Sequence, residues 1–359
     1  MTASIRKGSR WLVAGVCLCL CLCLAWLGSP AHAQAPASGT CRAGNRAQFI
    51  TLDRVYVRDE FRIVYALTGP HALPDATDSN GNGIPDKVED VATQLVAGKR
   101  LFDGAMGLVA PLRQARYAQA ESIDVFLLHM AQGNGRAYDE VMNYRLRFDA
   151  APGRCALRID LLNSHPNQNP TPIHELFHLH QYGYTMFKRR WFLEGTARWS
   201  EYALRPGSGP QRALPQTPAA LQEQVFGQAY EASLAWNRLA FLLDPLGRLN
   251  LPPQLAQLRY VDGSVVVQDD ALHGVAFMKA VLESLASLDR EVGAERGWRA
   301  FHWTEANQRS ALHDAPMLRQ IQDVVRQWAA RASPAHATEI DAFLALTPPP
   351  QKDDTDELE

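Results

Sequence analysis

The stretch PIHELFHLHQYGY (Pro172–Tyr184) carries three histidines and one glutamate within a few turns of chain. Its residue pattern predicts a helix over 171–182. Gly183 is well placed to end that helix, because glycine readily adopts the left-handed conformation of a helix C-terminus. Histidines at this spacing either hold a metal ion or pack in the interior. The choice between these two arrangements decides both fold and function.

Two of the histidines share one helix face. Residues four apart lie one turn above each other, so His174 and His178 direct two imidazoles toward a common point, as tetrahedral Zn²⁺ requires. Glu175 projects at the edge of that face, within reach of a water rather than of the metal. His180 lies on a different face, and we expect it to pack. A helix with two half-buried histidines and no metal is the alternative.

A catalytic zinc also needs a third protein ligand and one open position. The chain lacks the third histidine of the pattern H-E-x-x-H-x-x-G-x-x-H. Glu194 follows His178 by sixteen residues, far enough for a second helix, predicted over 191–204, to return antiparallel. Its surroundings, FLEGTARWSE, are apolar on one side, where a bare carboxylate is costly unless it binds a cation. We therefore predict His174, His178 and Glu194 as zinc ligands.

The segment EGTARWSE resembles the ligand helix of gluzincin metallopeptidases. That helix has Glu-Gly, then Ala, an aromatic residue and a second Glu, and the corresponding positions here are Glu194, Gly195, Ala197, Trp199 and Glu201. With HELFH and an upstream DSNGNGIPD loop, residues 78–204 are similar to a group of secreted bacterial metalloproteases. The resemblance implies an α+β, zincin-like fold, in which an N-terminal mixed sheet with the active-site helix precedes a mainly helical C-terminal lobe.

The chemistry expected of such a site is hydrolysis of peptide bonds by a zinc-activated water. Glu175 is expected to act as general base and to deliver the proton to the leaving amine. The oxyanion needs a further donor, which in relatives is a Tyr or His of the helical lobe. Tyr230 is the first candidate and His273 the second, although either residue also suits a packing or capping role.

The sequence departs from two branches of this group. Aminopeptidases have Asn where this chain has Leu193, and their Gly-x-Met-Glu-Asn strand has no counterpart, since GAMGL (Gly104–Leu108) reads as a helix end. Thermolysin-like enzymes have Asp where this chain has Arg198. Glu201 is the better candidate to orient a zinc histidine, with an exposed helix charge as its alternative. An endopeptidase is therefore favoured over an aminopeptidase.

The stretch DSNGNGIPDKVE (78–89) matches a twelve-residue EF-hand loop. Its expected calcium ligands are Asp78, Asn80, Asn82, the carbonyl of Ile84, Asp86 and Glu89, with Gly83 at the turn. No helix is predicted before it, so the site would be a strand-loop-helix that fixes the beginning of the next helix. Its neutral Asn ligands indicate modest affinity, suited to millimolar Ca²⁺. A plain Asn-Gly turn is the alternative.

The N-terminus predicts export. Arg6, Lys7 and Arg10 precede the apolar run Trp11–Leu27, and Ala31–Ala33 offers a cleavage site. We expect 1–33 to be a signal peptide and the mature protein to be periplasmic or secreted, the alternative being an uncleaved membrane anchor.

Cleavage of that signal would leave two cysteines, Cys41 and Cys155. In an oxidising compartment an isolated pair predicts one disulfide. A sharper alternative is Cys41 as an inhibitory thiolate on the metal.

Composition bounds the remaining possibilities. The chain has 359 residues, 21% of them charged, a formal net charge of −2 and no long basic block, so nucleic acid and anionic membranes are disfavoured partners. Strands are predicted at 61–69, 122–130 and 155–163. We expect a sheet lobe over 34–205, a helical lobe over 206–345 with helices at 219–243, 270–285 and 317–330, and an acidic tail over 346–359.

Three alternatives to an exported, monomeric zinc endopeptidase acting on proteins or peptides remain. The first is an aminopeptidase. The second is a non-catalytic envelope or binding protein that kept a zincin-like fold, although Glu175 and all three ligands are present. The third is a structural zinc site, which would normally be closed by cysteines that this chain does not place near the motif.

Overall fold

The centre of the fold is a six-stranded mixed sheet. The structure, a computed structural model, describes residues 41–45, 49–150 and 153–348. The strands are β1 (Arg42–Ala43), β2 (Arg54–Arg58), β3 (Phe61–Tyr65), β4 (Ser122–Leu128), β5 (Gly135–Asn143) and β6 (Cys155–Leu162). They lie in the order β1-β5-β6-β4-β3-β2. Strands β3, β4 and β6 are parallel, whereas β5 runs antiparallel to β6 and β2 runs antiparallel to β3.

Alternation of side chains along the strands gives the sheet two buried faces. Ile123, Val125 and Leu127 of β4 belong to the main hydrophobic core, together with residues of the helices. Phe126 and Leu128, which point the other way, join a smaller core with residues that flank the strands. Because both faces are covered, the central strands are mostly apolar, although each also buries a charged residue such as Arg62, Asp124 or Arg158, and their apolar runs are why they could be predicted from the sequence.

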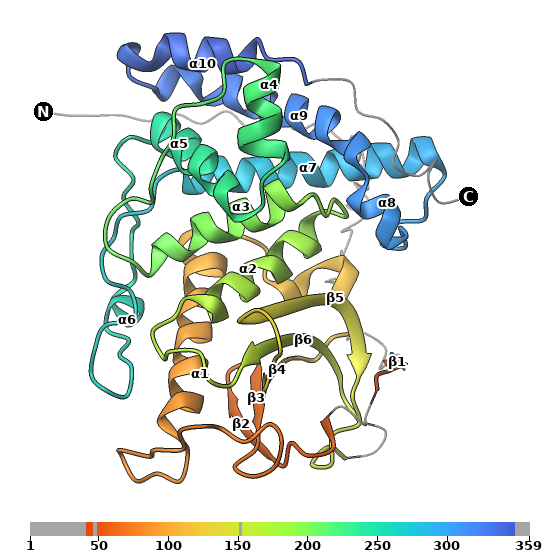
Figure 1. The fold of residues 1–359 in the computed structure, drawn as a ribbon, viewed down its shortest axis with the longest axis vertical. Helices are drawn as coiled ribbons and strands as arrows, with labels where there is room; N and C mark the ends of the chain where they lie inside the picture. The colour runs from red at the N-terminus through yellow and green to blue at the C-terminus, as the bar shows by residue number, and fades with distance from the viewer. Residues whose placement is uncertain (1–40, 46–48, 151–152, 349–359) are drawn as a thin grey trace, which may run out of the picture. The chain divides into compact units, whose positions relative to one another are not determined.

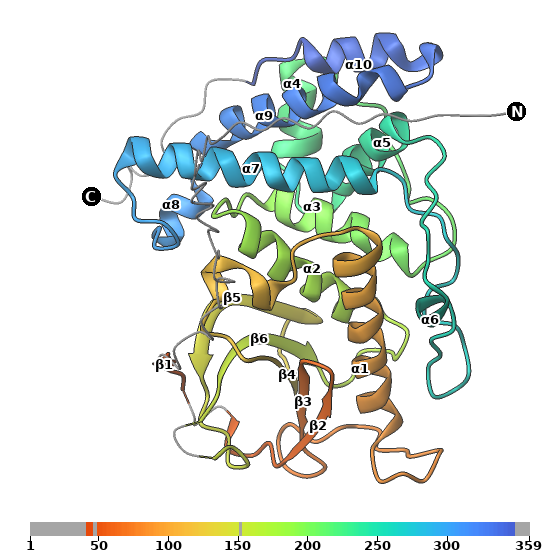
Figure 2. The same cartoon turned by 180° about the vertical axis from the view of Figure 1, so that it is seen from behind.

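Helices make up most of the remaining chain. They are α1 (Asp86–Lys99), α2 (Thr171–Tyr184), α3 (Arg190–Ser200), α4 (Pro218–Leu221), α5 (Ser233–Leu243), α6 (Pro253–Ala256), α7 (Val275–Arg296), α8 (Glu305–Arg309), α9 (Asp314–Trp328) and α10 (Ala337–Leu344). Helices α1 and α2 lie against the sheet, and α3, α5, α7, α9 and α10 lie beyond α2 (Figures 1 and 2). The fold is therefore α+β, with the sheet in the N-terminal half and helices dominating the C-terminal half.

Three predicted elements differ from the observed ones. Helix α2 continues through Gly183 to Tyr184, so the prediction that Gly183 ends it was wrong. A Cβ at Gly183 would lie 2.6 Å from Cγ of Gln114, so close packing accounts for this glycine. The helix expected over 219–243 is broken into α4, a π-helical turn (Gln222–Phe226) and α5. The helix expected from 270 begins only at Val275.

Residues 38–359 form one unit of the chain, which contains every described residue. The predicted signal peptide and the last residues of the acidic tail lie outside the described ranges. Within those ranges, no helix has both the length and the apolar character that crossing a bilayer would require.

The disulfide predicted between Cys41 and Cys155 is present and joins residues 114 apart in the sequence. It links the segment that carries β1 to the start of β6. Because both sulfur atoms are used in this bond, Cys41 is not a thiolate ligand of a metal.

Candidate metal centre

Helix α2 carries two of the candidate ligands in the interior of the protein. Leu176 and Phe177 on this helix belong to the main core. The Ile173 N–H donates to Oε1 of Gln94 on α1, at 3.3 Å. These contacts fix the rotation of α2, so that His174 and His178 face away from the sheet toward α3. Both imidazoles are 5% exposed.

Helix α3 supplies the third candidate ligand. Oε2 of Glu194 lies 3.2 Å from Nε2 of His174 and 3.6 Å from Nε2 of His178. The two imidazole rings are nearly perpendicular, with centroids 4.7 Å apart. Among the described residues, His174, His178 and Glu194 are the group of His, Cys, Asp or Glu side chains whose ligand atoms converge within 4.8 Å. Sequence spacing and tertiary packing thus bring together the same three residues.

The spacing of the donor atoms fits zinc. Bonds of about 2.0–2.1 Å in tetrahedral directions place two ligand atoms roughly 3.4 Å apart. The two distances from Glu194 to the imidazole nitrogens, 3.2 and 3.6 Å, bracket that separation. Two imidazoles and one carboxylate are also the donor set of catalytic zinc sites that leave a fourth position for water.

The far side of each imidazole is held by a partner. Nδ1 of His174 lies 2.9 Å from Oε1 of Glu201, at the end of α3. Nδ1 of His178 lies 2.6 Å from Oε1 of Gln181, whose amide Nε2 donates in turn to the Leu193 carbonyl and to Oγ1 of Thr196. A hydrogen bond at Nδ1 fixes the tautomer that leaves Nε2 free for a metal.

Without a metal, the cluster is held together by a proton. Burial by itself would lower the pKa of His174, but hydrogen bonds to Glu194 and Glu201 outweigh it and raise that pKa to about 10. Burial would raise the pKa of Glu194, but hydrogen bonds from His174 and His178 hold it well below its usual range. The site therefore demands positive charge, which either a protonated imidazole or a metal cation supplies.

Glu175 lies beside the ligands and against β5. It is 6% exposed, and its burial raises the pKa of its carboxyl group, while the two neighbouring histidines lower it. The Ala137 N–H of β5 donates to this carboxylate. A Cβ added at Gly135 would lie 2.6 Å from Oε1 of Glu175, so glycine is needed at this point for the strand to approach the helix. Glu175 is thus fixed at the edge of β5.

Tyr230 reaches the cluster from a short 3₁₀ turn before α5. Its ring centroid lies 5.9 Å from that of His174, and its hydroxyl donates to Glu194. Burial, and secondarily the charge of Glu194, raises the pKa of Tyr230 to about 12, so the hydroxyl stays protonated. The Arg198 guanidinium lies 5.8 Å from the centre of the Tyr230 ring.

Two other histidines are engaged away from the cluster. The second candidate donor, His273, interacts with Oγ of Ser208 and with the Asp244 carbonyl. His180 is fully buried, and its Nδ1 lies 3.1 Å from the Val109 carbonyl oxygen, the packing role that the helix geometry predicted.

The loop 78–89 brings together most of its expected calcium ligands. Asp78 accepts hydrogen bonds from the backbone N–H groups of Asn82 and Gly83. The amide groups of Asn80 and Asn82 both donate to the Glu89 carboxylate, at 2.8 and 2.9 Å. Rotation of these two amides would turn their oxygens toward Glu89, an arrangement that requires a cation between them.

Asp86 is the exception in this loop. Its two oxygens accept hydrogen bonds from the backbone and side chain of Ser79, rather than facing Glu89. At the ninth position of an EF-hand loop, contact with the ion is often made through water, so this placement suits a hydrogen-bonded outer ligand.

Two residues that shape the zinc cluster were not predicted. Gln181 orients His178, and Gly135 makes room for Glu175. The contact of Gln181 with His178 lies within α2 at a spacing of three residues, whereas its bonds to Leu193 and Thr196 and the contact of Gly135 with Glu175 join separate elements.

Comparison of the chain with protein-family models, with curated proteins and with solved structures found no match. The functional argument therefore depends on the geometry of the chain itself.

Proposed function

We propose that the protein is an exported zinc metallopeptidase with a zincin-like fold that cleaves peptide bonds within polypeptides. The observation that carries this proposal is the convergence of His174, His178 and Glu194, at the spacing of zinc ligands, beside the buried carboxylate of Glu175. The disulfide between Cys41 and Cys155 supports export, because such bonds persist in oxidising compartments.

Two side chains of the protein, Glu175 and Tyr230, would supply the proton transfer and the oxyanion hydrogen bond. A zinc ion bound here would polarise the scissile carbonyl and acidify a water molecule. Glu175 accepts the proton of that water and returns it to the leaving amine, a role that its raised pKa favours. The protonated hydroxyl of Tyr230, which donates to Glu194 in this structure, is available as a hydrogen-bond donor to the developing oxyanion.

The edge of β5 that no described strand pairs with beyond Met142 and Asn143 supports a polypeptide substrate. Strand β5 pairs with β6 along one side, whereas β1 pairs with it on the other side only at Met142 and Asn143. Glu175 lies at this strand through the Ala137 N–H. An extended peptide that adds to the edge would pass its backbone carbonyls across the Glu175 carboxylate.

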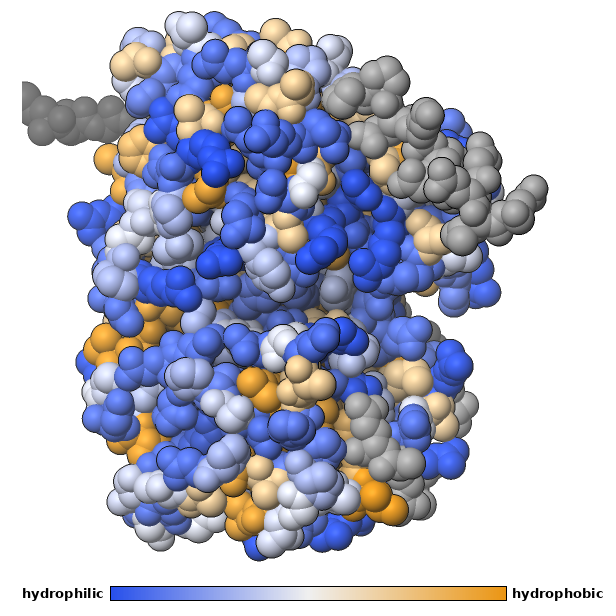
Figure 3. Space-filling view, viewed as in Figure 1, coloured by the Kyte–Doolittle hydropathy of each residue, from blue (hydrophilic) through white to orange (hydrophobic). Residues whose placement is uncertain are grey.

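The molecular surface also agrees with an extended substrate. The face seen in Figure 3, in the same orientation as Figure 1, is mainly hydrophilic and is hollowed across its middle at the level of α2. A substrate that runs through such a hollow in both directions is one that an endopeptidase cleaves. For this reason we favour an endopeptidase over an aminopeptidase, which closes one end of its site around the substrate amine.

We also propose that the loop 78–89 binds a structural Ca²⁺. Four of its side chains, those of Asp78, Asn80, Asn82 and Glu89, already interact within one hydrogen-bonded group. The loop ends at the first turn of α1, so an ion there would stabilise the beginning of that helix.

Hydrolysis of fluorescently labelled casein by zinc-loaded protein tests the peptidase proposal. Glu175→Gln removes the base while keeping the size of the side chain, and we expect it to lower the rate roughly 10²–10⁴-fold without releasing zinc. The matched control is Glu291→Gln on the exposed surface of α7, which should hydrolyse casein at the parent rate.

Two outcomes would contradict the proposal. If Glu175→Gln cleaves casein as fast as the parent, the assignment of Glu175 as base is wrong. If the parent holds zinc but cleaves neither casein nor a broad peptide library, the chain is a binding protein on this scaffold.

A further inference from the structure

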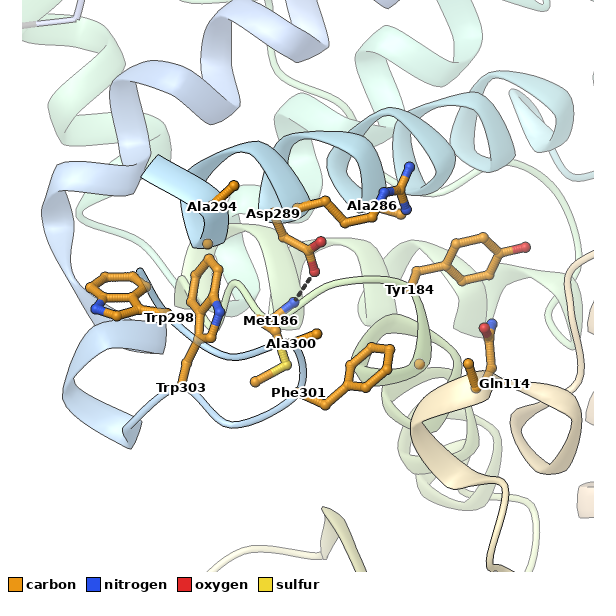
Figure 4. Close-up of a pocket in the computed structure, with 14 residues that line it drawn as sticks. Gln114, Tyr184, Met186, Ala286, Asp289, Ala294, Trp298, Ala300, Phe301 and Trp303 are labelled. Atoms are coloured by element: carbon orange, nitrogen blue, oxygen red, sulfur yellow. Dashed lines mark hydrogen bonds between the residues drawn. The ribbon is translucent and has the colours of Figure 1, made fainter. Parts of the chain in front are cut away.

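A second site is independent of the zinc cluster. A cavity of about 530 Å³ lies at the C-terminal end of α2, and none of the residues that line it is a candidate zinc ligand or its hydrogen-bond partner (Figure 4). It is built from four segments, which are residues 114–115, the end of α2 with the loop after it, the helix α7 and the loop that follows α7. Ligand-binding pockets in proteins commonly fall in the range of about 300–1,000 Å³.

Aromatic rings form much of the cavity wall. Tyr184, Trp298, Phe301 and Trp303 all line it. The two tryptophan rings pack edge to face, with centroids 4.7 Å apart. Phe301 remains 44% exposed, so it stands at the rim of the cavity.

The backbone at Phe301 is strained. Its φ is +62°, a left-handed conformation that is unfavourable for a bulky residue. The loop after α7 therefore holds an aromatic ring at the rim of the cavity at a cost in stability. Strain of this kind gathers at binding sites.

One buried carboxylate faces this aromatic wall. Asp289 is 8% exposed, and its Oδ2 accepts a hydrogen bond of 3.0 Å from the Met186 N–H. Within the described part of the chain, Oδ1 of Asp289 receives no hydrogen bond and the carboxylate forms no ion pair. Arg290 also lines the cavity, but it is exposed and donates to Oγ of Ser287. In Figure 4 the carboxylate descends from α7 toward the loop that carries Met186.

The protein balances the charge of Asp289 only in part, through the nearby guanidinium groups of Arg290 and Arg116, neither of which forms an ion pair with it among the described residues. Burial raises the pKa of its carboxyl group to about 6, although the Met186 N–H and the charges of Arg290 and Arg116 each lower that pKa. The group is therefore still mostly ionised between pH 7 and 8. A buried carboxylate without a directly paired cation is unfavourable, and a positively charged ligand in hydrogen-bond contact would relieve that cost.

We propose that this cavity binds a small organic cation, a primary or secondary ammonium group carried on an aromatic or apolar body. The ammonium N–H donates to Oδ1 of Asp289. The rings of Trp298, Trp303 and Phe301 provide both the apolar contact and the electron-rich faces that attract a cation. A neutral ligand would leave the carboxylate uncompensated, and an anionic ligand would be repelled by it.

Titration with two matched probes tests this proposal. 2-Phenylethylamine carries the ammonium group, and 2-phenylethanol is its neutral analogue of similar size. At pH 7.5, calorimetry and tryptophan fluorescence should show that the amine binds the parent at least about tenfold more tightly than the alcohol. Asp289→Asn keeps the acceptor for the Met186 N–H but removes the charge, and it should abolish that preference. The control Asp323→Asn, on the exposed surface of α9, should keep it.

A second variant covers the case in which Asp289→Asn does not fold. Phe301→Leu keeps apolar volume at the rim but removes the ring, and it should weaken amine binding about threefold to tenfold while changing alcohol binding less. Equal affinity for amine and alcohol in the parent, binding of neither probe, or tighter binding of 3-phenylpropionate would each overturn the proposal.

Discussion

At the scale of single residues, the distinctive feature is His174, which stands between two carboxylates. Glu194 approaches its Nε2 and Glu201 its Nδ1, at 3.2 and 2.9 Å. Without a metal, this arrangement raises the pKa of the imidazole to about 10. Zinc binding must therefore displace a proton from Nε2, while the contact to Glu201 persists and keeps the ring oriented.

Gln181 has the same orienting role for His178, and it also ties α2 to α3. Replacing it by alanine removes the acceptor at Nδ1 of His178 and leaves the Leu193 carbonyl without its side-chain donor. We expect Gln181→Ala to weaken zinc binding about 10–100-fold in competition with a chelator. Loss of the buried hydrogen bonds should also lower the free energy of unfolding by roughly 1–3 kcal/mol.

The exposed Gln119 provides the control, since Gln119→Ala should change neither quantity. Zinc affinity equal to that of the parent in Gln181→Ala would show that the orientation of His178 does not depend on this side chain.

Some residues of this site could be predicted from the sequence, and others could not. His174 and His178 follow from helix periodicity alone, because the two positions are on one face of one helix. Glu194 could be selected because an unpaired carboxylate in an apolar segment needs a cation. Gln181 was missed although it lies three residues after His178 on the same helix, a spacing that places the two side chains together. Gly135 could not be predicted, since its role depends on how β5 approaches α2.

At the scale of elements, the first turn of α1 is joined to the segment after β6 by a buried pair. Nζ of Lys87 lies 2.9 Å from Nδ1 of His165 and donates to the His165 carbonyl oxygen. Burial, and secondarily the charge of Lys87, lowers the pKa of His165 to about 4. The imidazole is therefore neutral in the folded protein at neutral pH.

This contact makes stability depend on pH. The pKa of His165 is lower in the folded chain than in the unfolded chain, where it is about 6.5, so the stabilising contribution is complete above pH 6.5 and is lost as pH falls toward 4. The shift corresponds to about 3 kcal/mol. Urea unfolding from pH 7.5 to 4 should show that His165→Gln, which does not titrate, loses less stability than the parent by about this amount.

His302→Gln is the matched control, since this histidine is exposed, and its curve should follow that of the parent. Parallel curves for the parent and His165→Gln would show that His165 does not couple folding to acid.

We expect the loop 78–89 to make the thermal stability of the protein depend on calcium, through the same end of α1. Removing Ca²⁺ with a selective chelator should lower the melting temperature of the parent by a few degrees, because the ion binds the folded loop and not the unfolded chain. Glu89→Gln should make the melting temperature insensitive to millimolar Ca²⁺, whereas Glu295→Gln on α7 should not. A melting temperature of the parent that does not respond to Ca²⁺ would contradict a calcium site.

Helices and strands could be predicted from the sequence where its apolar pattern agrees with the burial seen in the structure. The central strands β3, β4 and β6 could be located because they are buried on both faces. The region 219–243 has the composition of one long helix, yet the structure interrupts it with Gly227 and a turn that carries Tyr230 to the zinc cluster. Gly227 is a local signal for this break, which the apolar spacing of the region obscured.

At the scale of the whole molecule, the candidate metal centre lies where the sheet-bearing half meets the helical half. Trp191, near the start of α3, donates from Nε1 to Oδ1 of Asp314 on α9, and its carbonyl accepts from Nε1 of Trp236 on α5. The Arg189 guanidinium pairs with the same Asp314. The later helices therefore fix the helix that carries Glu194, while the sheet fixes the helix that carries the histidines.

The long-range arrangement was the part that sequence patterns could not supply. The order of strands in the sheet and the edge of β5 beside Glu175 depend on pairings between distant segments. The aromatic cavity beside Asp289 likewise draws its walls from four separate segments. None of these features leaves a local signal in the chain.

The zinc K-edge X-ray absorption spectrum of the zinc-loaded protein tests the central claim most directly. The account predicts one tightly held zinc per chain, with nitrogen and oxygen ligands at about 2.0–2.1 Å, two of them imidazoles, and no sulfur at about 2.3 Å. Glu194→Gln should bind zinc far more weakly and change the spectrum. A parent that retains no zinc, or a spectrum that Glu194→Gln leaves unchanged, would contradict the assignment of His174, His178 and Glu194 as the metal centre.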